Sequence, residues 1–130
     1  MLEAEQAAGM IARLDVRLAE IRAAVPTVAA AVLATRSGLI LAAHVDETTD
    51  PDGLAALGAD LMISVEAAAR GLAGGEPREV IVRGPEAHVI ALGAGNNAVL
   101  VALTDALTPA SSVLPDLREA ARELGEALAE

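Results

Sequence analysis

The chain has 130 residues, 54 % of them hydrophobic, and a formal net charge of −10. That length is typical of one domain and that apolar content excludes a disordered tail, so we expect a single domain over residues 1–130. The sequence holds no Cys, Lys, Phe, Tyr or Trp, which excludes thiol nucleophiles, Lys Schiff bases and Walker A phosphate loops, while the acidic charge disfavours nucleic acid as a partner.

The N-terminal third is predicted to form a helix followed by a hairpin. In residues 4–25 apolar side chains recur at spacings of 3 and 4, which is typical of an amphipathic helix, and Pro26 ends it. Residues 28–35 and 39–44 are apolar runs of strand length. Between them Gly38 supplies a residue that tolerates a positive φ, as a tight turn requires.

The middle of the chain predicts a second helix that is apolar almost all round. Asp50 is typical of an N-cap and Pro51 of the first helical position, and we expect the helix to run to about Leu72. One stripe, expected to face the sheet, consists of Leu54, Leu57, Leu61, Val65, Ala68 and Leu72. The remaining surface carries a single charge between Asp52 and Glu66. Such a helix is buried on more than one side, so a partner is expected to cover the other side.

The C-terminal half predicts three short strands at residues 78–83, 87–92 and 98–104, and a last helix capped by Ser112. Their short turns favour antiparallel neighbours. Residues 98–104 and the first strand are apolar on both faces and so are expected at the centre of the sheet. The sequence therefore predicts an α+β three-layer sandwich around an antiparallel sheet, with residues 78–83 at an edge.

The apolar second helix and the edge strand that follows it predict one dimerisation surface. Its candidate residues are Ala55, Ala59, Met62, Ile63, Glu66, Arg70, Val80 and Val82. The alternative is that this helix face is additional core under a loop. The length of the face, and the lack of another element to cover it, favour the interface.

The motifs in the sequence that could carry chemistry are each better explained by a structural role. Residues 93–98 match the dinucleotide fingerprint G-x-G-x-x-A, but a strand pattern follows them, which favours a hairpin turn. His44 and His88 lack a second ligand at metal-binding spacing, and Ser37 lies in a turn rather than a hydrolase elbow. The acidic residues at 46–52 lack the pattern of a calcium loop. We therefore predict no catalytic, cofactor-binding or metal-binding residue.

Three segments resemble a known family. They are the first hairpin at residues 30–42, the Ala-rich helix at 54–72 and the closing strand at 98–103. Over residues 8–129 the chain resembles Roadblock (dynein light chain type) domains, in the bacterial branch that contains the gliding-motility regulator MglB. The resemblance implies a profilin-like fold, with a central five-stranded antiparallel sheet, the second helix on one face, and the first and third helices on the other.

The same resemblance implies a function through partners. Members form homodimers through the second helix and third strand, and bacterial members bind small Ras-like GTPases, some raising GTP hydrolysis without supplying an arginine finger. No Arg is therefore given a catalytic role, Arg36 and Arg70 included. The expected function is a non-enzymatic homodimeric regulator of such a GTPase. The alternatives are a dimeric scaffold for a kinase or motor complex and, ranked last because aromatics are absent, a ligand-sensing domain.

The sequence also favours a cytoplasmic protein that is not inserted in a membrane. Its first six residues are acidic where a secretory signal is basic. The longest uncharged stretch, residues 87–104, is interrupted by Gly93, Gly95 and two Asn residues.

Overall fold

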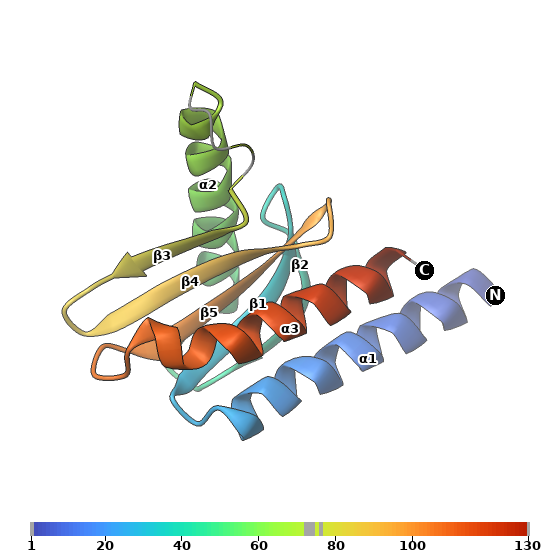
Figure 1. Cartoon of the computed structure of the whole chain (residues 1–130). Helices are drawn as coiled ribbons and strands as arrows, with labels where there is room; N and C mark the ends of the chain where they lie inside the picture. The colour runs from blue at the N-terminus through green and yellow to red at the C-terminus, as the bar shows by residue number, and fades with distance from the viewer. Residues whose placement is uncertain (1, 72–74, 76, 130) are drawn as a thin grey trace.

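The computed structural model describes residues 2–71, 75 and 77–129 (Figure 1). Its elements, in chain order, are α1 (Leu2–Ala24), β1 (Val28–Thr35), β2 (Ile40–Val45), α2 (Pro51–Ala69), β3 (Glu79–Arg83), β4 (Ala87–Ala94), β5 (Ala98–Asp105) and α3 (Ala110–Ala129). These bounds agree with the predicted elements to within a few residues. The predicted end of the second helix at Leu72 lies outside the described residues.

The five strands form one antiparallel sheet in the order β2-β1-β5-β4-β3. Strands β1 and β5 lie at the centre, where side chains are buried on both faces, as their apolar composition predicts. Strand β3 lies at an edge, which confirms that prediction, and none of its residues is fully buried.

Helices cover both faces of the sheet and make three layers (Figure 1). Helices α1 and α3 pack side by side on one face, over a core built from Leu14, Leu18, Leu33, Ile90, Leu100, Leu117 and Leu124. Helix α2 covers the other face over a smaller core that includes Val32, Leu54, Met62, Val99 and Val101. The predicted sandwich and its distribution of helices are confirmed.

Local signals set several element ends. The Asp50 carboxylate accepts a hydrogen bond from the Asp52 N–H and caps α2, as predicted. Gly38 has a φ of 91° in the β1–β2 turn. The cap expected at Ser112 is wrong, because α3 begins at Ala110. The Ser112 N–H and hydroxyl both donate back to the Pro109 carbonyl, which puts this residue inside the first turn.

The orientation of α2 differs from the prediction. The buried face consists of Leu54, Ala55, Gly58, Ala59 and Met62, whereas Leu57 is 44 % exposed. A Cβ at Gly58 would lie 2.1 Å from a methyl carbon of Val101 in β5. At Gly58 the helix therefore sits so close to the sheet that no side chain fits between it and Val101. Of the predicted stripe, Leu54 is buried, Leu61 and Val65 are half-buried, and Leu57 turns outward.

Among the residues that the structure describes, no helix combines the length and the hydropathy that a bilayer crossing requires.

Candidate functional site

Helix α2 extends beyond the edge of its own sheet. Figure 1 shows its C-terminal half projecting past β3. Every buried residue of α2 lies at or before Met62. Residues 63–69, here named the overhang, are exposed or half-buried, and Ile63 is 50 % exposed. With Leu57, the overhang presents apolar side chains that the described residues of this chain do not bury.

The structure separates the eight predicted interface residues into two groups. Ala55, Ala59 and Met62 are buried against the sheet of this chain, so their side chains are not exposed for contact with a second protein. They are small or flexible side chains on the close-packed face, and their apolar character reflects intramolecular packing.

The other five predicted residues are at least partly accessible. On α2, Ile63 is exposed, while Glu66 is half-buried and forms an ion pair with Arg36 from the β1–β2 turn. Arg70, at the C-cap of α2, is exposed. On β3, Val80 is half-buried against the α2-side core, and Val82 is 41 % exposed. These side chains therefore remain candidates for an interface.

Strand β3 directs half of its backbone away from the sheet. The Arg78 carbonyl accepts from the Gly93 N–H, and the Gly84 N–H donates to the Ala87 carbonyl, so even-numbered residues bond towards β4. By the alternation of an antiparallel strand, the N–H and C=O groups of Glu79, Ile81 and Arg83 point outward. An open edge of this kind is ready to pair with another strand.

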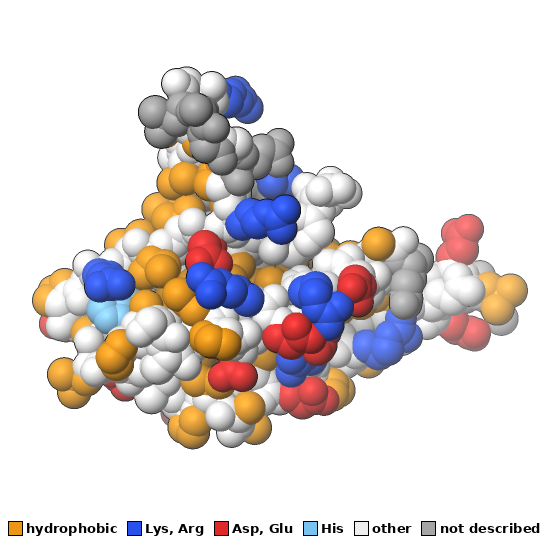
Figure 2. Space-filling view, in the orientation of Figure 1, with side chains coloured by type: hydrophobic (Ala, Val, Ile, Leu, Met, Phe, Trp, Pro, Cys, Tyr) orange, Lys and Arg blue, Asp and Glu red, His pale blue; other side chains and the backbone are white. Residues whose placement is uncertain are grey.

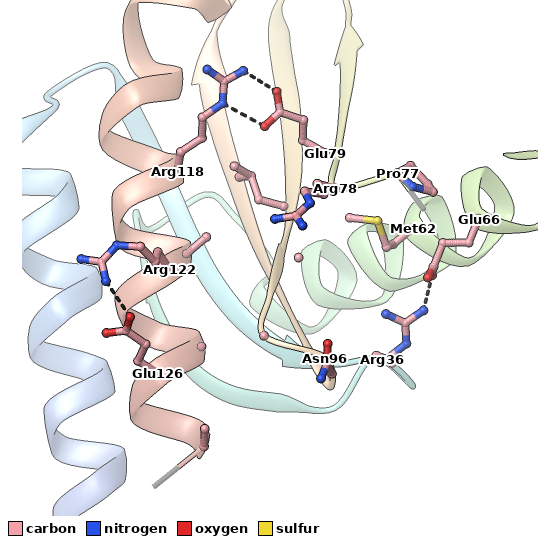
Figure 3. Close-up of a pocket in the computed structure, with 16 residues that line it drawn as sticks. Arg36, Met62, Glu66, Pro77, Arg78, Glu79, Asn96, Arg118, Arg122 and Glu126 are labelled. Atoms are coloured by element: carbon pink, nitrogen blue, oxygen red, sulfur yellow. Dashed lines mark hydrogen bonds and ion pairs between the residues drawn. The ribbon is translucent and has the colours of Figure 1, made fainter. Parts of the chain in front are cut away.

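A hollow of about 920 Å³ lies at the corner of the sheet beside the start of β3 (Figure 3). Here β4 and its turn into β5 extend beyond β3, between α2 and α3. We call this hollow the notch; its lining includes Arg36, Met62, Glu66, Arg78, Glu79, Asn96, Arg118, Arg122, Gly125 and Glu126.

Close approach of two glycines shapes one wall of the notch. A Cβ at Gly125 would lie 2.5 Å from the Gly95 nitrogen. Helix α3 therefore rests directly on the backbone of the β4–β5 turn, where Gly95 has a φ of 66°.

Ion pairs organise the charges of the notch. Four of the nine arginines line it, and in Figure 2 blue and red side chains interleave across the face that α3 covers. Arg118 donates from Nε and Nη2 to the two oxygens of Glu79, at 3.0 and 2.6 Å. This bond lowers the pKa of the Glu79 carboxyl and raises that of the Arg118 guanidinium. Arg122 bonds Glu119 and Glu126, so α3 presents paired charges.

The remaining sequence candidates have structural surroundings. Residues 94–98 form the turn between β4 and β5, so the strand interpretation of the glycine motif is confirmed. The Nδ1 atom of His44 lies 2.9 Å from Nη1 of Arg22 and accepts its hydrogen bond. The Ser37 hydroxyl lies 3.0 Å from that of Thr35 within the β1–β2 turn.

His88 is buried opposite Thr104 on β5, and its Nδ1 atom has no hydrogen-bond partner among the described residues. Within the described part of the chain, no three His, Asp or Glu side chains gather closely enough to hold a metal ion.

Sequence reasoning missed the exposed Leu57, the outward-facing Arg83 and the ion pairs of the notch. The small residues Ala55, Gly58 and Ala59, at spacings of 3 and 1, are the signal that identifies the close-packed face of α2. The ion pairs of Arg36 with Glu66 and of Arg118 with Glu79 join residues 30 and 39 positions apart, so no local pattern indicates them.

Solved structures show what the fold is similar to. The gliding protein MglB from Thermus thermophilus is 24 % identical, with a TM-score of 0.80 and coverage of 91 % of this chain and 90 % of that chain. A Roadblock/LC7 domain from Streptomyces avermitilis is 22 % identical, with a TM-score of 0.82 and coverage of 89 % and 98 %.

Acanthamoeba castellanii profilin IA is 14 % identical, with a TM-score of 0.61 and coverage of 86 % and 96 %, so the fold is profilin-like. No curated protein matches the chain in sequence. The family model for the Roadblock/LC7 domain matches residues 14–104, which is more than half of the chain. The chain therefore belongs to the Roadblock/LC7 domain family.

Proposed function

We propose that this protein is a homodimeric, non-enzymatic regulator of the MglB-like branch, which binds a small Ras-like GTPase and modulates its nucleotide cycle. The observation that carries the proposal is the overhang of α2 beside the open edge of β3 (Figure 1). An apolar helix surface and an unpaired strand edge, adjacent to each other, are complementary to a second copy of themselves.

Dimerisation explains why two apolar side chains, Val82 and Ile63, are exposed to solvent in the single chain. Val80 packs against the α2-side core, so Val82, two residues along the strand, points to the same side of the sheet. When two β3 strands pair, the overhang of one copy extends over the sheet of the other and covers Val82. Ile63 is buried in the same contact, at a gain of about 25 cal/mol for each Å² of apolar surface.

A small GTPase is the partner that the family resemblance implies. The fold similarity to MglB supports this branch of the family. The arginines Arg36, Arg118 and Arg122 are each held in an ion pair with a glutamate of this chain. As the family resemblance implies, regulation proceeds through reshaping of the GTPase, with no arginine supplied to the nucleotide.

The dimer is tested by native mass with a matched pair of variants. Ile63→Asp places a charge on the overhang, and Val16→Asp makes the same kind of change at an exposed valine of α1. We expect light scattering with refractive-index detection to give a monomer for the first variant and a dimer for the second. Equal masses for the two variants would contradict the proposed surface.

The GTPase is tested by capture and then by kinetics. The immobilised wild-type chain is incubated with host lysate loaded with a GTP analogue or with GDP. We expect a small P-loop GTPase in one nucleotide lane, and the purified GTPase to change its hydrolysis rate when the wild-type chain is added. A kinase or structural protein captured without a GTPase would instead support the scaffold and overturn the regulatory function.

A further inference from the structure

The open edge of β3 carries a charge pattern that is complementary to its own reverse. Its five residues read Glu-Val-Ile-Val-Arg, with the acidic residue at one end and the basic residue at the other. Glu79 bonds to Arg118 on α3 and Ile81 packs against the α1–α3 core, so Arg83 points to the same α3 side of the sheet.

We propose that β3 pairs with β3 of a second copy with Ile81 opposite Ile81, so that Glu79 of each copy faces Arg83 of the other. This register rests on the homodimer proposed above and specifies its geometry. A two-fold axis perpendicular to the sheet keeps both α2 helices on one side. Such an axis places one residue of β3 directly opposite its own copy, with both side chains on the same side of the sheet. The residues inside the strand that could take this central position are Val80, Ile81 and Val82.

The register centred on Ile81 satisfies the outward backbone groups best. It overlaps all five residues of both strands, and the outward-pointing residues 79, 81 and 83 bond to 83, 81 and 79 of the second copy. Beyond the strand ends, Pro77 then lies opposite Pro85, so neither proline leaves a β3 carbonyl without a donor. Moving the centre to Val80 puts Pro77 opposite Arg83, and moving it to Val82 puts Pro85 opposite Glu79. Each shift deprives an outward carbonyl of its donor, because proline has no N–H.

The charges of Glu79 and Arg83 favour the same register. With Ile81 at the centre, Glu79 lies between its own Arg118 and Arg83 of the second copy, and the symmetry makes this contact twice. A carboxylate has enough lone pairs for both guanidinium groups. In the other two registers Arg83 faces Pro77 or Ile81 and has no cross-strand carboxylate. Opposite charges placed directly across a strand pair stabilise it, so the ends of β3 favour the centred register.

The absence of cysteine makes the register directly measurable. In the Ile81 register, residue 81 faces itself with a Cα separation of about 5.5 Å, within the range of a disulfide. Residues 80 and 82 face each other, so each lies about 7–8 Å from its own copy, which is too far for bridging. We expect oxidation to produce a covalent dimer from Ile81→Cys and none from Val80→Cys or Val82→Cys alone. An equimolar mixture of the last two, unfolded and refolded together, is expected to give the covalent dimer.

The mixture keeps the test valid if Ile81→Cys does not fold, because it reports the same register without that substitution. A wild-type dimer in which Val80→Cys or Val82→Cys links to itself would overturn the register and leave the dimer standing. A wild-type dimer in which none of these pairs links would also overturn it. A monomeric wild-type chain would overturn both the dimer and the register.

Discussion

Substitution of Gly58 by alanine tests how closely α2 is seated on the sheet. The added Cβ would lie 2.1 Å from a methyl carbon of Val101, against about 3.5 Å for an ordinary carbon contact, so about 1.4 Å of separation is missing. Val101 is fully buried and β-branched, so its methyl groups have no free rotamer to occupy. Overpacking of this kind costs about 1–3 kcal/mol. Against this cost, alanine in a helix interior stabilises the fold by about 0.8–1 kcal/mol relative to glycine.

Gly9→Ala is the matched control, because it makes the same change inside α1 with only a side-chain atom of Arg13 at 3.8 Å. We expect Gly9→Ala to raise the free energy of unfolding by up to about 1 kcal/mol and Gly58→Ala to fall about 1–3 kcal/mol below it. Urea unfolding followed by far-UV circular dichroism, at one protein concentration, measures both, since the chain has no aromatic reporter. Equal free energies for the two variants would refute the close seating of α2.

Three further outcomes are expected. Asp50→Ala removes the α2 cap and lowers the free energy of unfolding by about 1 kcal/mol, whereas Asp50→Asn retains most of it in the same urea titration. Arg118→Gln raises the pKa of Glu79 towards its ordinary value of 4.5, which a ¹³C carboxyl titration by NMR detects. Because the pKa of Glu79 is lowered in the folded state, the ionised carboxylate stabilises the fold at pH values above its unfolded pKa. This stabilisation is lost as the pH falls through the folded pKa. The free energy of unfolding of Arg118→Gln should therefore lack this dependence on acidic pH. Arg83→Glu sets like charges across the paired strands and weakens the dimer in sedimentation equilibrium, while Arg83→Lys retains it.

The sequence was sufficient to predict the five strands, the two that lie at the centre of the sheet and the one at its edge. Strands β1 and β5 are apolar on both faces along most of their length, which is typical of a strand covered by helices above and below. The charges at both ends of β3 indicated an edge. Family resemblance added which helix covers which face, and this assignment is confirmed.

The orientation of α2 could not be obtained from periodicity. The leucines at 54, 57 and 61 with Val65, and the small residues at 55, 58 and 59, both follow helical spacing, so both faces satisfy the same pattern. What decides between them is the distance between helix and sheet, because Gly58 must lie against Val101. That distance depends on side-chain volumes from two separate elements.

The notch was unpredictable for a related reason. Its side chains come from α2, α3, the β1–β2 turn, the start of β3 and the β4–β5 turn, and they meet because β3 ends short of β4. The ion pair between Glu79 and Arg118 joins an edge strand to a helix 39 positions away. Only the assembled fold brings these residues together.

The native mass of the wild-type chain across the micromolar range tests the central claim most directly. The overhang and the open β3 edge predict a species of twice the 13.1 kDa chain mass, measured by light scattering with refractive-index detection. A mass of 13.1 kDa throughout that range would contradict the account, because the apolar overhang would then remain exposed without a partner.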